Sequence, residues 1–187
     1  MELNIKTPED ILEFMKANIK YGWLDINNEE HVGNMKNFRR LYKVSSLDEV
    51  LEHGLGCCIE QVYLMKQFLD AIGIENKMFC TRVYEPNDFN DLDADERMHC
   101  FILYYLDGMV HQIEHPNWER IGIYHYNSEE EAIKEINKIY EEMSGGIARP
   151  VTEFYEAPAG MSFKEFNAYI NNLDIQGIKI HMLHILK

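Results

Sequence analysis

The feature that most constrains the fold is a single helix followed by a run of strands in the middle of the chain. Apolar side chains recur at helical spacing over residues 58–72, which predicts a buried, central helix. Residues 77–84, 98–106 and 109–114 are strand-like, and Asp107-Gly108 between the last two predicts a tight hairpin turn. One helix followed by three antiparallel strands predicts an α+β fold in which the helix packs against the sheet.

Helix-capping signals organise the rest of the chain. Thr7-Pro8 is typical of an N-cap followed by proline at the first helical position, and three other helix starts have a serine three residues before a glutamate. These signals predict helices at residues 8–20, 46–53, 128–143 and 162–170, with a less regular helical stretch at 35–41. Strands are expected at 151–155 and 177–186. No internal repeat or linker interrupts the chain, so residues 1–187 are expected to form one domain.

The charge balance limits the possible partners. The 187 residues include 18 basic and 32 acidic side chains, a formal net charge of −14, which argues against nucleic acid or an anionic membrane surface. No apolar run reaches membrane-spanning length and no targeting segment is evident, so a cytoplasmic location is expected. The four cysteines, Cys57, Cys58, Cys80 and Cys100, lie in apolar surroundings and are expected to be reduced thiols.

A glycine-rich turn delivers a cysteine to the first turn of the central helix. The segment reads Gly54-Leu55-Gly56-Cys57-Cys58-Ile59-Glu60-Gln61. A thiol at this position meets the unpaired N–H groups and the positive dipole end of the helix, which favour the thiolate. Cys58 is therefore a candidate nucleophile, and Cys57 is expected to pack behind the turn.

The hairpin provides a candidate base and a candidate carboxylate. A two-residue turn at Asp107-Gly108 places Phe101 opposite Glu114. Because alternate residues of a strand share a sheet face, His99 and Glu114 are expected on one face and His115 on the other. This register favours Glu114 as the partner of His99. A bulge in either strand would reverse the choice, so His115 remains the alternative third member.

Three segments between residues 54 and 118 resemble the sequence motifs of one known family. They are Gly56-Cys57-Cys58 with its helix ending in Leu69-Asp70-Ala71-Ile72-Gly73-Ile74, the strand His99-Cys100-Phe101, and Ile113-Glu114-His115-Pro116. Together they resemble the Gly-x-Cys helix, the histidine strand and the third-member segment of the transglutaminase-like superfamily. A direct overlay puts His115 at the family's usual aspartate, whereas a bacterial branch with Phe-Glu-His-Ser-Trp type text has glutamate where Glu114 stands. The resemblance implies a papain-related α+β domain.

The resemblance also implies cysteine chemistry on an amide or ester carbonyl. Cys58 would attack, His99 would move the proton and Glu114 would orient the imidazole, giving a protease, deamidase or acyltransferase that acts on a peptide or protein amide. Trp23 is a possible oxyanion donor, and Gln61 a possible substrate contact. The alternative from another class is a binding module that keeps the fold without turnover.

Metal sites are the competing interpretation of the same residues. Cys57-Cys58 and His99-Cys100 lack the Cys-x-x-Cys spacing of a structural zinc site. Within the acidic segment at residues 85–96, Asp91-Leu92-Asp93-Ala94-Asp95-Glu96 begins like a calcium loop, but Glu96 replaces its glycine and Ile102 its bidentate glutamate. We therefore expect no metal and no cofactor. The acidic segment is instead expected to be a solvated loop, with a preference for cationic substrates as one possible role.

Overall fold

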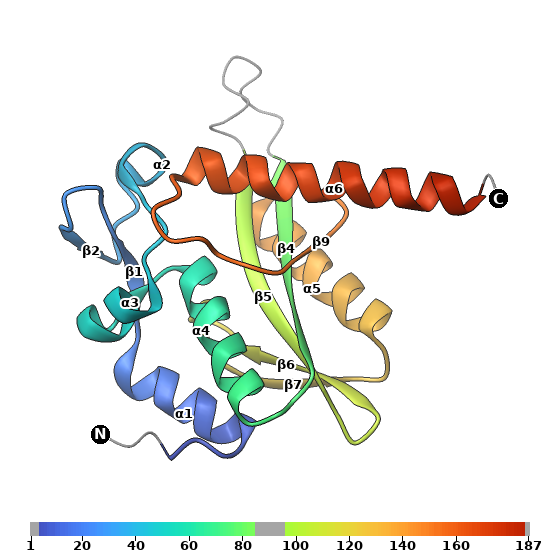
Figure 1. Ribbon diagram of the computed structural model, residues 1–187, viewed down its shortest axis with the longest axis horizontal. Helices are drawn as coiled ribbons and strands as arrows, with labels where there is room; N and C mark the ends of the chain where they lie inside the picture. The colour runs from blue at the N-terminus through green and yellow to red at the C-terminus, as the bar shows by residue number, and fades with distance from the viewer. Residues whose placement is uncertain (1–3, 85–95, 186–187) are drawn as a thin grey trace.

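The computed structural model describes residues 4–84 and 96–185, which form an α+β fold (Figure 1). The helices are α1 (Pro8–Asn18), α2 (Phe38–Leu41), α3 (Leu47–His53), α4 (Cys58–Ala71), α5 (Glu129–Ser144) and α6 (Phe163–Ile185). The strands are β1 (Lys20–Leu24), β2 (Glu30–Val32), β3 (Leu55–Gly56), β4 (Asn76–Tyr84), β5 (Glu96–Leu106), β6 (Met109–Glu114), β7 (Gly122–Tyr126), β8 (Ile147–Ala148) and β9 (Thr152–Phe154).

The main sheet is antiparallel and has the strand order β7-β6-β5-β4-β8, with β9 also paired to β4. The predicted hairpin is confirmed, because Leu106 pairs with Met109 and Leu103 with Gln112. Asp107 and Gly108 occupy the turn with φ of 53° and 75°. Two consecutive positive φ angles match the twist of the flanking strands, which explains why this dipeptide sets the register.

Helices cover both faces of the long β4–β5 pair. Figure 1 shows α4 on one side of these strands and α5 on the other. Cys100, Ile102 and Tyr104 belong to the apolar cluster that includes α1 and α4. Phe101 and Leu103, the intervening residues, belong to the cluster that includes α5. This alternation along β5 is the expected consequence of the strand period, and it gives the sheet two buried faces.

The capped helices begin where the sequence predicts. Thr7 and Ser46 each form a capping box, and the Ser128 side chain accepts from the N–H of Glu131. Helix α1 ends at Asn18, slightly before its predicted end, and α2 is shorter than the predicted helical stretch at 35–41. Among the helices of the described residues, none is long and apolar enough to cross a bilayer.

The expectation of a strand at residues 177–186 was wrong. Residues 177–185 are not a strand but the continuation of α6, because one glycine costs a helix only about 1 kcal/mol and no proline follows to end it. Strands β1, β2, β3, β7 and β8 were not predicted. A small second sheet with the order β2-β1-β3 follows α1, and β7 adds a fourth antiparallel strand after β6.

Candidate active site

The small sheet positions the turn that precedes α4. Strand β3 pairs in parallel with β1, with Tyr21 beside Gly56. Gly54 ends α3 in the left-handed conformation with φ of 61°, and a Cβ there would lie 2.7 Å from the Asn18 carbonyl oxygen. Glycine is therefore required for both backbone conformation and close approach. The chain then enters α4 with Cys57 as N-cap and Cys58 as first helical residue, as predicted.

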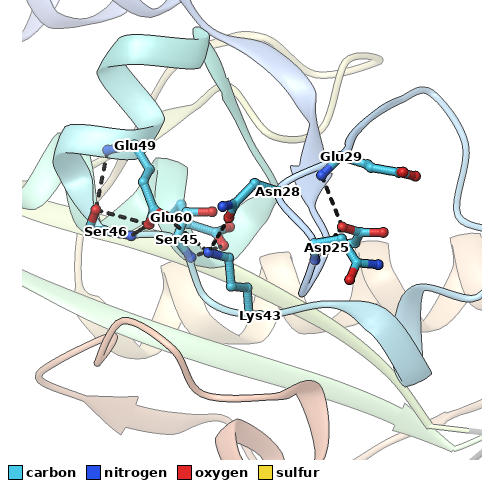
Figure 2. A network of polar contacts seen from close by, with 9 residues as sticks. Asp25, Asn28, Glu29, Lys43, Ser45, Ser46, Glu49 and Glu60 are labelled. Carbon is cyan, nitrogen blue, oxygen red and sulfur yellow. Dashed lines mark hydrogen bonds and ion pairs between the residues drawn. The ribbon is translucent and has the colours of Figure 1, made fainter.

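The buried carboxylate of Glu60 holds this turn through hydrogen bonds. The Glu60 Oε2 accepts from the Cys57 backbone N–H at 3.0 Å and from the Cys57 thiol at 2.9 Å. Its Oε1 accepts from the Tyr42 hydroxyl at 2.6 Å and from the Ser45 N–H at 3.1 Å; Figure 2 shows Glu60 beside Ser45. Burial raises the pKa of Glu60, although these donors oppose the shift. Cys57 is thus packed behind the turn and tied to it.

The surroundings of Cys58 favour its thiolate. A hydrogen bond from the Cys100 thiol is the largest cause that lowers the pKa of Cys58 well below its usual value of 9.0, burial opposes it, and the His99 imidazole lowers the pKa further. Cys58 is 6% exposed and lines a cavity. The sulfur is therefore buried among donors but borders open space.

His99 is held between a carboxylate and an aromatic ring. Its Nε2 lies 3.3 Å from the Glu114 Oε2. Burial would lower the pKa of His99, but the charge of Glu114 and hydrogen bonds with Cys58 and Glu114 raise it to about 9. The ring stacks on Tyr140 of α5 with centroids 3.9 Å apart and planes at 21°. Cys58 and His99 can therefore exist as a thiolate–imidazolium pair.

The structure brings Glu114, rather than His115, to His99. Glu114 is 1% exposed. Its Oε2 also accepts from the Gln112 side-chain amide at 2.9 Å, and its Oε1 accepts from the Asn117 backbone N–H at 2.9 Å. These donors hold the carboxylate in place beside the His99 ring. The preference for Glu114 that follows from the hairpin register agrees with this geometry.

His115 and Gln61 form a separate contact behind the turn. His115 Nδ1 lies 2.7 Å from Gln61 Oε1, and the Gln61 amide donates to the Gly56 carbonyl at 2.7 Å. Burial lowers the pKa of His115. Since Gln61 is fully buried and both ends of its amide are engaged, it links the helix to the turn and to β6.

Trp23 lies in the small sheet and its only side-chain donor is engaged. The indole N–H donates to the Asn34 carbonyl at 2.8 Å, and the ring stacks on His31 with centroids 4.0 Å apart. The side chain is 1% exposed. In this arrangement the indole N–H is not available to a substrate oxygen.

Among the cavities that border Cys58 or His99, two share part of their lining. One, of about 600 Å³, includes Cys58 in its lining, and the other, of about 430 Å³, includes His99, Asn117 and the exposed Trp118. Tyr21 and Met35 line both cavities. Space for bound groups is therefore present on the sulfur side and on the imidazole side.

Several residues of the site were not predicted from the sequence. They are Glu60, Gln112, Asn117 and Tyr140, which contact the turn, the carboxylate or the imidazole. Glu60 stands three residues after Cys57, the spacing of a capping box, so that signal was present. Nothing in the sequence around Tyr140 shows that its ring lies on His99.

One group of side chains in the described part of the chain has the composition of a metal site. Ligand atoms of Asp25, Glu29 and His31 lie within 4.8 Å of one another. Asp25 Oδ1, however, accepts from the backbone N–H groups of Asn27 and Glu29 at 2.7 and 3.0 Å, and Figure 2 shows the contact with Glu29. The Asp25 carboxylate therefore has a structural role in closing this loop.

No family model matches the sequence, and no curated protein matches it. Among solved structures, the (BACCR)NAT3 arylamine N-acetyltransferase from Bacillus cereus, described as having a unique Cys-His-Glu catalytic triad, aligns with a TM-score of 0.38 at 18% identity. That alignment covers 61% of this chain and 43% of the other. Arylamine N-acetyltransferase C from Bacillus anthracis aligns with a TM-score of 0.33 at 14% identity, covering 61% and 41%. This chain thus spans less than half of either neighbour, and similarity at this level does not establish a shared activity.

Proposed function

We propose that the protein is a cysteine-dependent acyl-transfer enzyme of transglutaminase-like architecture that acts on an amide or ester carbonyl. The observation that carries the proposal is the 3.3 Å approach of His99 Nε2 to the buried Glu114 carboxylate, together with a cysteine at the start of α4 whose pKa the His99 imidazole lowers. The Cys58 thiolate attacks the carbonyl carbon to form a tetrahedral intermediate. His99, as imidazolium, gives its proton to the leaving amine or alcohol, and an acyl-enzyme remains.

The second half-reaction restores the thiolate. Neutral His99 takes a proton from water or from an amine, which attacks the thioester and releases Cys58. Water gives hydrolysis, and an amine gives transfer. We favour hydrolysis of a peptide or protein amide, and the cavity beside His99 offers space for either acceptor.

Glu114 and the start of α4 support these steps. Glu114 holds the imidazole by Nε2 and stabilises its cation. The first N–H groups of a helix have no partner within the helix, so those at the start of α4 can donate to the oxygen of the tetrahedral intermediate.

Alkylation of Cys58 with iodoacetamide tests the proposal. At about pH 6, we expect Cys58 to react about tenfold or more faster than free cysteine, with mass spectrometry locating the label, and the excess rate to disappear in His99→Ala. Cys80→Ser is the matched control, because Cys80 is fully buried in β4, and it should leave the rate unchanged. A rate in the wild type no higher than that of free cysteine would contradict the proposal and favour the non-catalytic binding module.

A further inference from the structure

The four cysteines of the chain gather in one buried cluster. All lie in the described residues, are free thiols and belong to the apolar cluster that includes α1 and α4. Cys57 and Cys58 come from the start of α4, whereas Cys80 and Cys100 are paired directly across β4 and β5. Opposed residues of an antiparallel pair share a sheet face, so both strand cysteines lie on the face that α4 covers. The proposed acyl transfer uses one of these four sulfurs.

Cys100 is the strand cysteine that meets Cys58. Its thiol donates a hydrogen bond to the Cys58 sulfur. Cys100 lies on the face of β5 that packs against α4, and Cys58 is the first residue of that helix. Sulfurs that share a hydrogen bond are neighbours, and a disulfide brings two sulfurs to about 2.05 Å. The two side chains are therefore placed to form a disulfide.

The other two cysteines are less suited to react with Cys58. Consecutive Cα atoms lie about 3.8 Å apart, below the usual span of about 4.4–6.8 Å for a disulfide, so a Cys57–Cys58 link would be strained. The Cys57 thiol is also engaged with the Glu60 Oε2 at 2.9 Å. The Cys80 thiol is engaged with Cys100. Cys100 is therefore the sulfur best placed to meet an oxidised Cys58.

The difference in exposure between the two sulfurs sets the order in which they react. Cys58 borders a cavity of about 600 Å³ and is 6% exposed, whereas Cys100 is fully buried. Thiolates rather than thiols react with peroxides, and burial raises the pKa of Cys100 well above its usual value of 9.0. A small oxidant that enters the cavity therefore reacts with Cys58, and Cys100 remains a thiol.

The charge of the chain does not hinder such an oxidant. Hydrogen peroxide is uncharged, so a net charge of −14 does not repel it. The acidic segment at residues 85–95, for which a preference for cationic substrates was expected, lies outside the described residues.

We propose that Cys58 and Cys100 form a reversible redox pair, in which oxidation of Cys58 by hydrogen peroxide is followed by a disulfide between them. The Cys58 thiolate attacks one peroxide oxygen. An S–O bond forms, the O–O bond breaks and hydroxide leaves, so Cys58 is oxidised to a sulfenic acid and the peroxide is reduced. The Cys100 sulfur then attacks the Cys58 sulfur. The S–S bond forms, the S–O bond breaks, and the Cys100 proton leaves with the hydroxyl group as water.

The disulfide blocks acyl transfer and protects the nucleophile. More peroxide converts a sulfenic acid irreversibly to a sulfinic acid, whereas a dithiol reductant returns a disulfide to two thiols and is itself oxidised to a disulfide. The inference rests on the proposed function in taking the Cys58 thiolate as the reactive group. It goes beyond that function in assigning a role to Cys100 and a reversible inactive state to the site.

Peroxide treatment of the reduced protein tests the inference. After a molar excess of hydrogen peroxide at neutral pH, mass spectrometry of a non-reducing digest should find the peptides of Cys58 and Cys100 linked within one chain. Labelling of Cys58 by iodoacetamide should fall about tenfold or more, and dithiothreitol should restore it.

Two serine variants identify the sulfur responsible. Cys100→Ser keeps a hydrogen-bond donor beside Cys58 but removes the second sulfur. Cys58 should then persist as a sulfenic acid that dimedone traps, and after prolonged peroxide dithiothreitol should recover about tenfold less labelling than in the wild type. Cys80→Ser is the control, because Cys80 is equally buried and lies opposite Cys100, and it should form the disulfide as the wild type does. Thermal unfolding verifies that each variant is folded, and disulfide mapping in the wild type decides the inference even if Cys100→Ser is not.

Three results would overturn the inference: a wild-type Cys58 that resists peroxide or accumulates as sulfenic or sulfinic acid, a linkage of Cys58 to Cys57 or to a second chain, and full recovery in Cys100→Ser. These results are distinct from failure of the proposed function. Rapid alkylation of Cys58 without the disulfide supports the enzyme and rejects the redox pair. A Cys58 of ordinary reactivity that still forms the disulfide does the reverse.

Discussion

Tyr140 stacks on His99 on the face of the sheet that α5 covers, with ring centroids 3.9 Å apart. Helix α5 thus supports the imidazole that contacts a thiol on α4. We expect Tyr140→Ala to lower the rate of Cys58 alkylation at neutral pH by about 2- to 10-fold, since stacked aromatic pairs contribute about 0.5–1.5 kcal/mol. Tyr140→Phe keeps the ring and should retain most of the rate. If the two variants are equally slow, the hydroxyl rather than the stack is the important group.

Substitutions of Glu114 and of His115 should affect the His99 pKa differently. Because the Glu114 charge is the main favourable cause of the raised value of about 9, Glu114→Gln should lower the His99 pKa by about one pH unit or more. His115→Ala should leave it near the wild-type value, since His115 contacts Gln61 instead. NMR titration of the ring measures both. The reverse pattern would make His115 the third member.

The parts of the site that follow from local rules were predictable from the sequence. Asp107-Gly108 allows one favourable pairing of β5 with β6, and strand alternation then puts His99 and Glu114 on one face. The cysteine at the start of α4 follows from the turn before it. These features depend only on neighbouring residues and on the period of a strand or helix.

The contacts that depend on packing were not predictable in the same way. The apolar stripe of α5 indicates that Tyr140 faces the protein, but not that it meets a residue some forty positions earlier. The short strand β1 directly follows α1, and its pairing with β3 brings together segments that are distant in sequence. In α6 the local pattern itself was misleading. The alternation after Gly177 predicts a strand, but the helix continues to Ile185.

Glu60 should make stability depend on pH in a specific direction. Its pKa is raised above the ordinary value of 4.5, mainly by burial. A group with a raised folded-state pKa contributes stability below its unfolded pKa and loses it as pH rises through the folded value. The wild type should therefore lose stability relative to Glu60→Gln as the pH rises above the ordinary glutamate pKa of 4.5. Urea unfolding of both proteins across this range measures the difference, and a constant difference would contradict the raised pKa.

Gln61 should matter to stability more than to chemistry. Its amide donates to the Gly56 carbonyl and its oxygen contacts His115, and all three residues are buried or nearly so. Gln61→Leu keeps the side-chain volume but leaves two polar groups without partners, which we expect to lower the free energy of unfolding by about 2–4 kcal/mol. His115→Leu alone should also destabilise the protein.

A double variant tests whether the stability losses come from the Gln61–His115 hydrogen bond itself. Replacing both hydrogen-bond partners by apolar groups costs less than the sum of the single changes, since no imidazole is then left unpaired beside leucine. We therefore expect Gln61→Leu with His115→Leu to be more stable than additivity predicts, as measured by urea unfolding. Strict additivity would mean that the two side chains do not interact. If folded Gln61→Leu instead loses much of its Cys58 alkylation rate, Gln61 positions the nucleophile, and it does so through its hydrogen bond to Gly56 in the turn.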